Sequence, residues 1–193
     1  MTKDKPKPFS SLYPKVTVEL GMGDGRLLES LAKRNSNSLF IGIELDSNQY
    51  REAQSRISLS NVVIMNSSFE DIVPRFLDES IDQFISVLPD PAFIDNTRQE
   101  HWRPFYTTVY FKLKKGGKLR LVTELTDELW QPVGNESYSK WADWLKCSFM
   151  SLGFTLSSQK EGAPRRYLSH CLQQFRGDPQ RIRLITLDLL KQR

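Results

Sequence analysis

Short β-branched runs alternate with amphipathic segments along the chain, and this alternation limits the available folds more than any other feature. It predicts strands over 16–20, 39–45, 61–65, 81–88, 118–123, 154–158 and 181–190. It predicts helices over 26–34, 47–57, 70–77, 101–113 and 136–152, and an irregular loop over 162–180. Strands that alternate with helices form parallel sheets covered on both sides. We therefore expect an α/β fold with a mostly parallel, doubly wound, seven-stranded sheet and helices on both faces.

The length of the chain suits one globular domain. With 193 residues and 39% hydrophobic content, a single core over 15–193 is expected. Residues 1–14 combine prolines with lysines and serines, which predicts a flexible arm. No apolar run approaches the ~20 residues that a membrane helix needs. The amino terminus also lacks the apolar stretch of a secretory signal, so a cytoplasmic location is expected.

Cysteine and histidine are scarce. The two cysteines, Cys147 and Cys171, predict reduced thiols rather than a disulfide framework. The two histidines, His101 and His170, lie far apart and have no cysteine at ligand spacing. We therefore expect no metal site.

The most informative motif is VELGMGDGR at 18–26, where Gly21, Gly23 and Gly25 lie between a predicted strand and a predicted helix. Alternate glycines let a ligand approach the backbone closely because no Cβ intervenes. The GxGxG spacing differs from the GxGxxG spacing that holds a pyrophosphate. The carboxylate of Glu19, just before the glycines, would repel a diphosphate but suits the cationic amino acid end of a sulfonium cofactor. The motif therefore predicts S-adenosylmethionine as the cofactor.

A second acid completes this candidate site. Glu44 ends the next predicted strand about twenty residues later, where a carboxylate can accept both hydroxyls of a ribose. Asn66 to Ser68 follow the third strand, where the adenine ring would lie; capping of the next helix is an equally weighted alternative. Asp46 is expected to cap the second helix. The predicted cofactor site also includes Leu45, Ser67, Ser68, Phe69 and Leu88.

With these motifs in place, the chain resembles the tRNA (guanine-N7)-methyltransferases. The resemblance covers most of residues 16–190 and is carried by VELGMGDGR (18–26), FIGIE (40–44), LSNVVIM (59–65), LPDP (88–91) and LKKGGKLRLVTE (113–124). It implies a Rossmann-like class I methyltransferase fold and methylation of N7 of guanine in tRNA. It also implies that Asp90 is the main active-site carboxylate, and that Thr123 and Glu124 face the substrate, with glutamate in place of an aspartate.

Two parts of the chain depart from that family. The family carries a basic run after its Pro-Asp-Pro, whereas this chain has AFIDNTRQEHWR at 92–103, a shorter segment whose two acids and two arginines leave no net charge, so the basic loop is largely missing. A late Thr-(Lys/Arg)-Phe-Glu motif aligns loosely with Ser169 to Leu172, without the glutamate. The family is also not the only resemblance: the GDGR sequence is similar to ribosomal RNA methyltransferases that confer aminoglycoside resistance.

RNA contacts are expected from cations near the end of the chain. Arg165, Arg166, Arg176 and Lys115 could reach phosphates, and Tyr167 or Trp102 could stack on a base. A protein that methylates ribosomal RNA or a small molecule remains an alternative, as does a non-catalytic, cofactor-binding partner subunit that binds RNA. The expected oligomeric state is a monomer or homodimer.

Overall fold

The computed structural model of this protein describes residues 13–126, 129 and 131–192. Apart from its last two positions, the predicted arm at 1–14 lies outside the described residues. One seven-stranded sheet, in the order β3-β2-β1-β4-β5-β7-β6, organises the fold. Its strands are β1 Val16–Leu20, β2 Leu39–Glu44, β3 Val62–Asn66, β4 Ile81–Val87, β5 Leu113–Thr126, β6 Phe154–Glu161 and β7 Ile182–Lys191.

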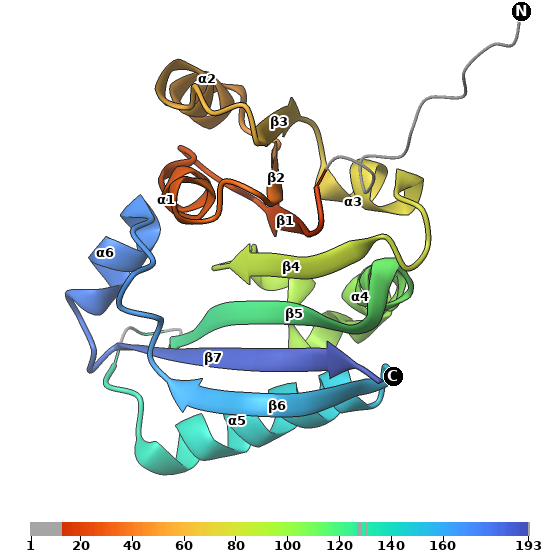
Figure 1. The fold of residues 1–193 in the computed structure, drawn as a ribbon. Helices are drawn as coiled ribbons and strands as arrows, with labels where there is room; N and C mark the ends of the chain where they lie inside the picture. Colours follow the sequence, from red (N-terminus) through yellow and green to blue (C-terminus); the bar gives the residue numbers. More distant parts are fainter. Residues whose placement is uncertain (1–12, 127–128, 130, 193) are drawn as a thin grey trace, which may run out of the picture.

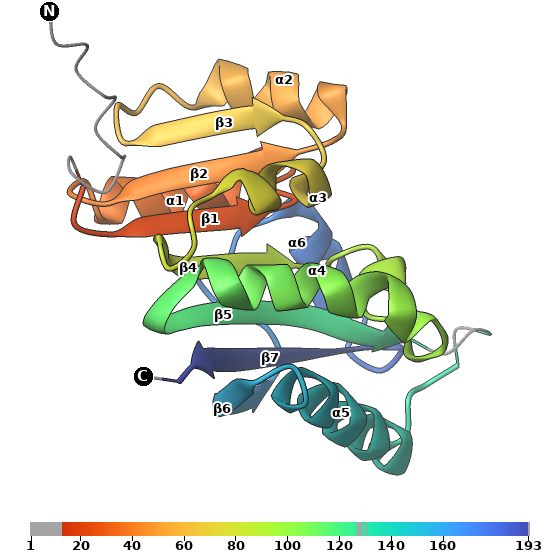
Figure 2. The ribbon, with the colours of Figure 1, turned by 90° about the vertical axis from the view of Figure 1, so that its right-hand side faces the viewer.

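The strands are parallel except for β7, which runs antiparallel to both β5 and β6. Helices cover both faces of the sheet, as Figures 1 and 2 show: α3, α4 and α5 lie on one side, and α1 and α6 on the other. The helices are α1 Arg26–Arg34, α2 Ser47–Arg56, α3 Phe69–Ile72, α4 Gln99–Lys112, α5 Asn135–Met150 and α6 His170–Arg176. The predicted fold class is therefore confirmed.

The structure differs most from the sequence prediction at α6, α4 and β5; in addition, α3 is shorter and β6 longer than predicted. The loop expected over 162–180 contains α6, whose first turn is capped by the Ser169 side chain accepting from the Leu172 N–H at 3.2 Å. Helix α4 begins at Gln99, two residues before the predicted start at 101, and the Trp102 indole donates to the Asp95 carbonyl at 2.8 Å in this first turn. Strand β5 begins at Leu113 because an irregularity in its pairing with β4 accommodates the extra residues before Lys118.

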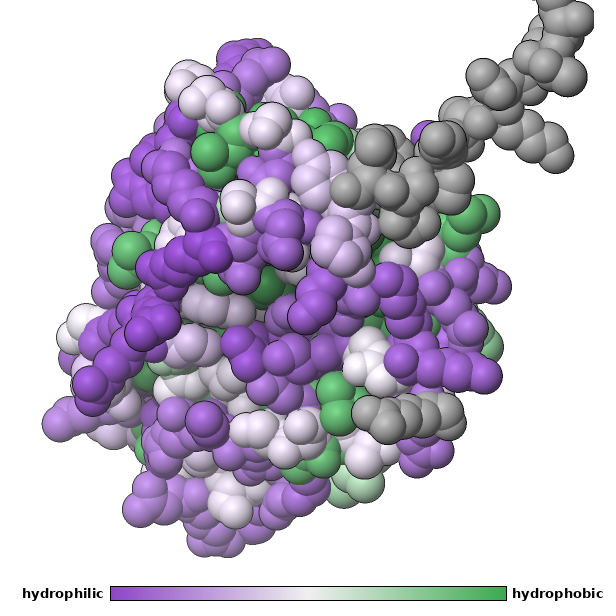
Figure 3. All heavy atoms as spheres, viewed as in Figure 1, coloured by the Kyte–Doolittle hydropathy of each residue, from purple (hydrophilic) through white to green (hydrophobic). Residues whose placement is uncertain are grey.

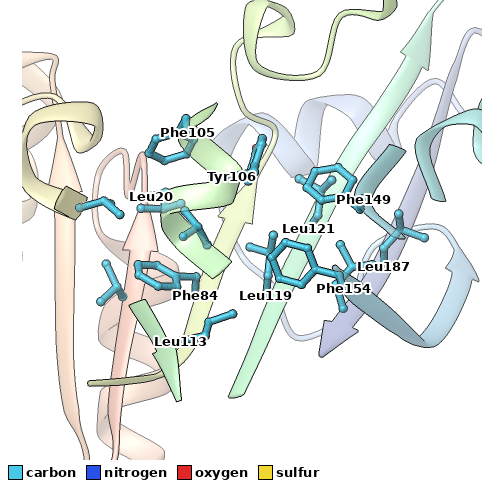
Figure 4. Packing of buried hydrophobic residues seen from close by; sticks show 14 of the residues in the cluster. Leu20, Phe84, Phe105, Tyr106, Leu113, Leu119, Leu121, Phe149, Phe154 and Leu187 are labelled. Atoms are coloured by element: carbon cyan, nitrogen blue, oxygen red, sulfur yellow. The ribbon is translucent and has the colours of Figure 1, made fainter. Parts of the chain in front are cut away.

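The main core lies between the sheet and the helices α4 and α5. Figure 4 shows Phe84 and Leu119 of the sheet packed under Phe105 and Tyr106 of α4 and Phe149 of α5. All five side chains are buried, which fixes α4 and α5 on this face.

Two aromatic residues proposed for base stacking belong to the interior. The Trp102 side chain is fully buried and stacks on Phe149 with a centroid distance of 5.7 Å. Tyr167 is 4% exposed and packs with Leu27 of α1 and Leu172 of α6 on the opposite face. The prediction that either ring stacks on a base is therefore wrong, because packing leaves neither face accessible.

Among the described residues, no helix has the length and apolar character needed to cross a bilayer. The same residues contain no group of three or more histidine, cysteine, aspartate or glutamate side chains placed to hold a metal ion.

Candidate active site

A cavity of about 260 Å³ opens at the carboxyl ends of β1 and β4. These neighbouring strands mark the point where the strand order reverses, which is where open α/β sheets bind ligands. The cavity is bounded by the glycine loop on one side, by the segment after β4 on another and by the start of α6 on a third. Its lining residues include Glu19, Gly21, Gly23, Asp24, Glu44, Gln49, Phe69, Leu88, Asp90, Ser169, His170 and Cys171.

The glycines after β1 serve two different purposes. Gly21 and Gly23 line the cavity with φ values of 69° and 58°, a left-handed conformation that favours glycine. A Cβ added to Gly21 would meet no atom within 4 Å, so the absent side chain leaves the space open. Gly25 is not among the residues that line the cavity. A Cβ there would lie 2.9 Å from the Ala53 Cβ, so this glycine allows α1 to pack against α2.

Glu44 is held rigidly at the rim of the cavity. Its Oε2 accepts from the Gly23 N–H at 2.8 Å, and its Oε1 accepts from the Asp46 N–H at 2.8 Å. Each carboxylate oxygen retains lone-pair capacity for another donor. The preorganised carboxylate therefore fits a pair of ribose hydroxyls.

Glu19 is the most unusual group on the cavity wall. The residue is 2% exposed, and its Oε2 is buried without a hydrogen-bond partner. Burial, followed by the nearby charges of Asp24 and Glu44, raises the pKa of Glu19 well above its ordinary value. An unpaired buried carboxylate is costly unless a ligand supplies a counter-charge. Together with the open space at Gly21, this carboxylate fits the ammonium end of S-adenosylmethionine.

The residues predicted near the adenine ring divide into two groups. Phe69 lines the cavity, but Ser67 and Leu45 do not, and Leu45 is 70% exposed. The Ser68 hydroxyl accepts from the Glu70 N–H at 3.1 Å and caps α3, which is the alternative that the sequence left open. Gln49 of α2 lines the cavity and was missed, because nothing in the sequence relates a helical glutamine to the glycine loop.

The Asp46 side chain caps α2, as predicted. Its Oδ1 accepts from the Asn48 and Gln49 N–H groups.

Asp90 lines the same cavity from the segment that follows β4. Its Oδ1 accepts from the Ala92 N–H at 2.8 Å, while the side chain stays exposed at the rim. Leu88, two residues earlier, has a φ of 52°, which is strained for a leucine. Such strain at a ligand-binding edge is typical of a functional turn, and here it directs the Pro89–Asp90 segment across the end of β4.

The substrate-facing pair expected from the resemblance lies on the neighbouring strand. Thr123 and Glu124 follow Val122, which pairs with Val87 of β4, so both lie at the carboxyl edge of the sheet. The Thr123 Oγ1 and the Glu124 Oε2 are buried without hydrogen-bond partners. Burial raises the pKa of Glu124 to about 7. This edge therefore carries a second carboxyl group that changes charge near neutral pH.

The start of α6 forms the third wall of the cavity through Ser169, His170 and Cys171. Sequence reasoning did not include these residues in the site. The loose alignment of Ser169 to Leu172 with a late family motif was the available signal, but no helix was expected there.

The predicted RNA-binding cations have different surroundings. Arg165 and Arg166 are exposed. The Arg176 guanidinium donates to the carbonyls of Tyr167 at 2.9 Å and Pro164 at 2.6 Å, so it braces the loop before α6. Lys115 lies near the start of β5, at the sheet edge opposite the cavity. For Arg176 and Lys115 the expected RNA contact does not agree with these positions.

The chain is similar in sequence to known methyltransferases. A family model described as "Putative methyltransferase" matches residues 14–156, well over half of the chain. A tRNA (guanine-N(7)-)-methyltransferase of Rhizobium johnstonii is 24% identical over 187 residues, covering 85% of this chain and 78% of the relative. A protein of the same name from Yersinia pseudotuberculosis is 30% identical over 156 residues, covering 78% of this chain. The match spans only 61% of that Yersinia protein.

Solved methyltransferase structures share the fold. The 16S rRNA methyltransferase KamB superposes with a TM-score of 0.70 at 13% identity, covering 95% of this chain and 90% of that one. An antibiotic-related methyltransferase gives a TM-score of 0.65 at 20% identity, covering 92% and 88% of the two chains. At these identities the similarity concerns the fold alone.

Proposed function

The chain belongs to the methyltransferase family whose model covers residues 14–156, and we propose that it methylates N7 of a guanine in tRNA. The two relatives described above, both named tRNA (guanine-N(7)-)-methyltransferase, support this substrate. The family resemblance drawn from the sequence is thereby confirmed. The observation that carries the proposal is the unpaired Glu19 carboxylate beside an open glycine loop, facing the same cavity as Asp90.

In the proposed mechanism the chain's own residues hold the cofactor and orient the acceptor. S-adenosylmethionine supplies an electrophilic methyl group for in-line displacement by a nitrogen lone pair. Glu19 would bind the ammonium group, and Glu44 would accept the ribose hydroxyls. The backbone at Gly21 and Gly23 leaves room for the cofactor between these two acids.

Asp90 would act on the acceptor side. The N7 lone pair of guanine is free at neutral pH, so the reaction requires no general base. Positive charge develops on the base as the methyl group is transferred, and a nearby carboxylate stabilises that charge. Asp90 has this position at the rim, while Glu124 offers a second carboxyl group on the next strand.

Mass spectrometry of nucleosides tests the proposal directly. The protein is incubated with labelled S-adenosylmethionine and with tRNA and ribosomal RNA in separate reactions. Labelled 7-methylguanosine in the tRNA digest is the expected result. Label confined to ribosomal RNA would favour the alternative substrate. Binding of S-adenosylhomocysteine without transfer to either RNA would favour a non-catalytic partner subunit.

A further inference from the structure

A groove of about 480 Å³ lies between α1 and the segment that leads into α6. One side consists of the α1 residues Arg26, Glu29, Lys33 and Arg34, and the other side includes Leu168. Three cations therefore face the groove against a single carboxylate. Leu168 is 44% exposed, which places an apolar surface beside these charges.

The cations of the groove differ in how far they are neutralised. The Lys33 Nζ lies 2.6 Å from the Glu29 carboxylate, and the Arg26 Nε lies 2.9 Å from the Asp24 carboxylate. Arg34 takes part in no ion pair within the described part of the chain. The same holds, among those residues, for Arg165 and Arg166, which form an exposed turn just before Leu168.

This side of the molecule therefore has a positive excess. In Figure 3 hydrophilic residues cover the side over α1 and α6, as they cover most of the visible face.

The groove adjoins the cofactor cavity along both of its walls. On the α1 side, Arg26 lines the groove and Asp24, two residues earlier, lines the cavity. On the α6 side, Leu168 lines the groove and Ser169 lines the cavity. A polymer with one unit in the cavity could thus continue into the groove without leaving the protein surface.

We propose that this groove binds the phosphodiester backbone of the RNA substrate. The inference rests on the proposed function and locates the RNA beside the cavity. Lys33, Arg34 and Arg166 would contact phosphates and release counterions, and Leu168 would contact a sugar or base. A nucleic acid strand combines negatively charged phosphates with apolar base and sugar surfaces, which fits a groove lined by cations and by the exposed Leu168.

The position of the groove also agrees with the lack of net positive charge in the loop at 92–103. That loop follows Asp90, and its two arginines are balanced by two acids. Positive charge next to the cavity is instead carried by α1 and by the turn before α6.

A pair of double variants tests the proposal. Lys33→Gln/Arg34→Gln removes two cations from the groove. Lys140→Gln/Arg51→Gln is the matched control, since Lys140 forms the same (i,i+4) pair with a glutamate at 2.7 Å, and Arg51 is an exposed helical arginine. Filter binding of tRNA is measured at several salt concentrations, and S-adenosylhomocysteine binding by calorimetry.

The groove variant is expected to bind tRNA about tenfold more weakly than the control, with a salt-dependence slope smaller by about 1–2. Its affinity for S-adenosylhomocysteine should be unchanged. Arg166→Gln, in the exposed turn that precedes Leu168 of the opposite wall, should weaken tRNA binding in the same direction without altering the melting temperature. This second variant separates a binding defect from damage to α1.

If the two double variants bound tRNA with equal affinity, the proposal that the groove binds RNA would be wrong, even if the wild-type protein forms 7-methylguanosine in tRNA. Absence of tRNA binding by the wild-type protein would overturn it as well. Conversely, groove-dependent tRNA binding without any methyl transfer would support the groove and contradict the proposed function. The two proposals therefore fail through different measurements.

Discussion

At the scale of single residues, Asp90 provides the most direct test of the mechanism. Asp90→Asn retains a side-chain oxygen that can cap the following turn but removes the negative charge. We expect kcat for tRNA methylation to fall by about 100-fold or more, the size typical of a lost transition-state stabilising group. The affinity for S-adenosylhomocysteine should stay within about twofold. Steady-state kinetics and calorimetry measure the two effects.

Asp95→Asn is the matched control for this change. Asp95 caps the next turn of the same loop through the Thr97 N–H at 2.7 Å and does not line the cavity. This variant should keep wild-type kcat. An Asp90→Asn enzyme with the same kcat as the control would remove Asp90 from the mechanism.

The raised pKa of Glu19 leads us to expect that cofactor binding depends on pH. In the free protein its pKa is raised by burial, and pairing with an ammonium group must lower that pKa again. The complex therefore holds fewer protons than the free protein, so binding releases protons, and affinity rises with pH until the free carboxyl group is ionised. Calorimetry of S-adenosylhomocysteine in two buffers of different ionisation enthalpy measures the release.

Glu19→Gln should abolish this proton release and weaken binding by about 10- to 100-fold, the equivalent of one charged hydrogen bond. The raised pKa also means that the folded state binds the proton more tightly than the unfolded chain. As the pH rises above the pKa that Glu19 has in the unfolded chain, its carboxyl group therefore lowers the free energy of unfolding. Glu19→Gln should accordingly raise the melting temperature at neutral pH. Unchanged affinity would show that Glu19 does not face the ammonium group.

The sequence predicts which residues near the glycine loop face the ligand, because the motif is local. Glu19, Gly21, Gly23 and Glu44 all face one cavity, as their spacing indicates. Gly25 was assigned to the ligand for the same reason, but packing against Ala53 determines that glycine. A spacing rule cannot distinguish these two demands, since both require a residue without a Cβ.

At the scale of elements, α6 could not be predicted from periodicity. It has seven residues, which is too few to show a repeating apolar face, and its sequence contains one buried residue, Leu172. Its place on the cavity follows from long-range packing of Tyr167 and Leu172 against Leu27 of α1. By contrast, the short β-branched runs bounded by polar residues predict all seven strands, and the bounds agree closely for β1 to β4 and β7, while β5 and β6 are longer than predicted.

The loop before α6 gives the prediction at this scale. Arg176→Ala removes the guanidinium donor from the carbonyls of Tyr167 and Pro164, and Pro164 keeps its bond from the Tyr167 N–H, at a cost of about 1–3 kcal/mol. For a chain of this size we expect the melting temperature to fall by about 3–10 °C. S-adenosylhomocysteine affinity should fall too, because α6 lines the cavity. Differential scanning fluorimetry and calorimetry measure these effects.

Arg165→Gln is the control, since the Arg165 side chain is exposed. Arg176→Lys should recover little of the loss, because an ammonium group cannot reproduce the planar donors of a guanidinium. If Arg176→Ala lowered only the affinity for tRNA, the original assignment of this residue as an RNA contact would be correct.

At the scale of the whole molecule, the sequence predicts seven strands but not the position of the last one. β7 inserts between β5 and β6 and runs antiparallel to both, so the final strand of the chain is an interior strand of the sheet. Its buried residues Ile185, Leu187 and Leu189 belong to the main core. Strand order of this kind depends on contacts between distant segments, which a pattern of apolar residues does not encode.

This insertion makes the fold depend on residues beyond the segment that the family model matches. A chain that ends at residue 181 lacks β7, so β6 has no partner strand and the outer edge of β5 is unpaired. The three leucine and isoleucine side chains that β7 contributes to the core would each forfeit about 1.5–3 kcal/mol of burial. That sum is comparable with the whole stability of an ordinary domain.

We therefore expect the shortened chain to show no cooperative thermal transition and no S-adenosylhomocysteine binding, as judged by circular dichroism and calorimetry. The same loss should follow Leu187→Asp in the full chain, which places a charge in the core, whereas Thr155→Asp on the exposed edge of β6 should melt like the wild-type protein. A cooperative transition in the shortened chain would show that the glycine-loop half and β5 fold without the closing strand.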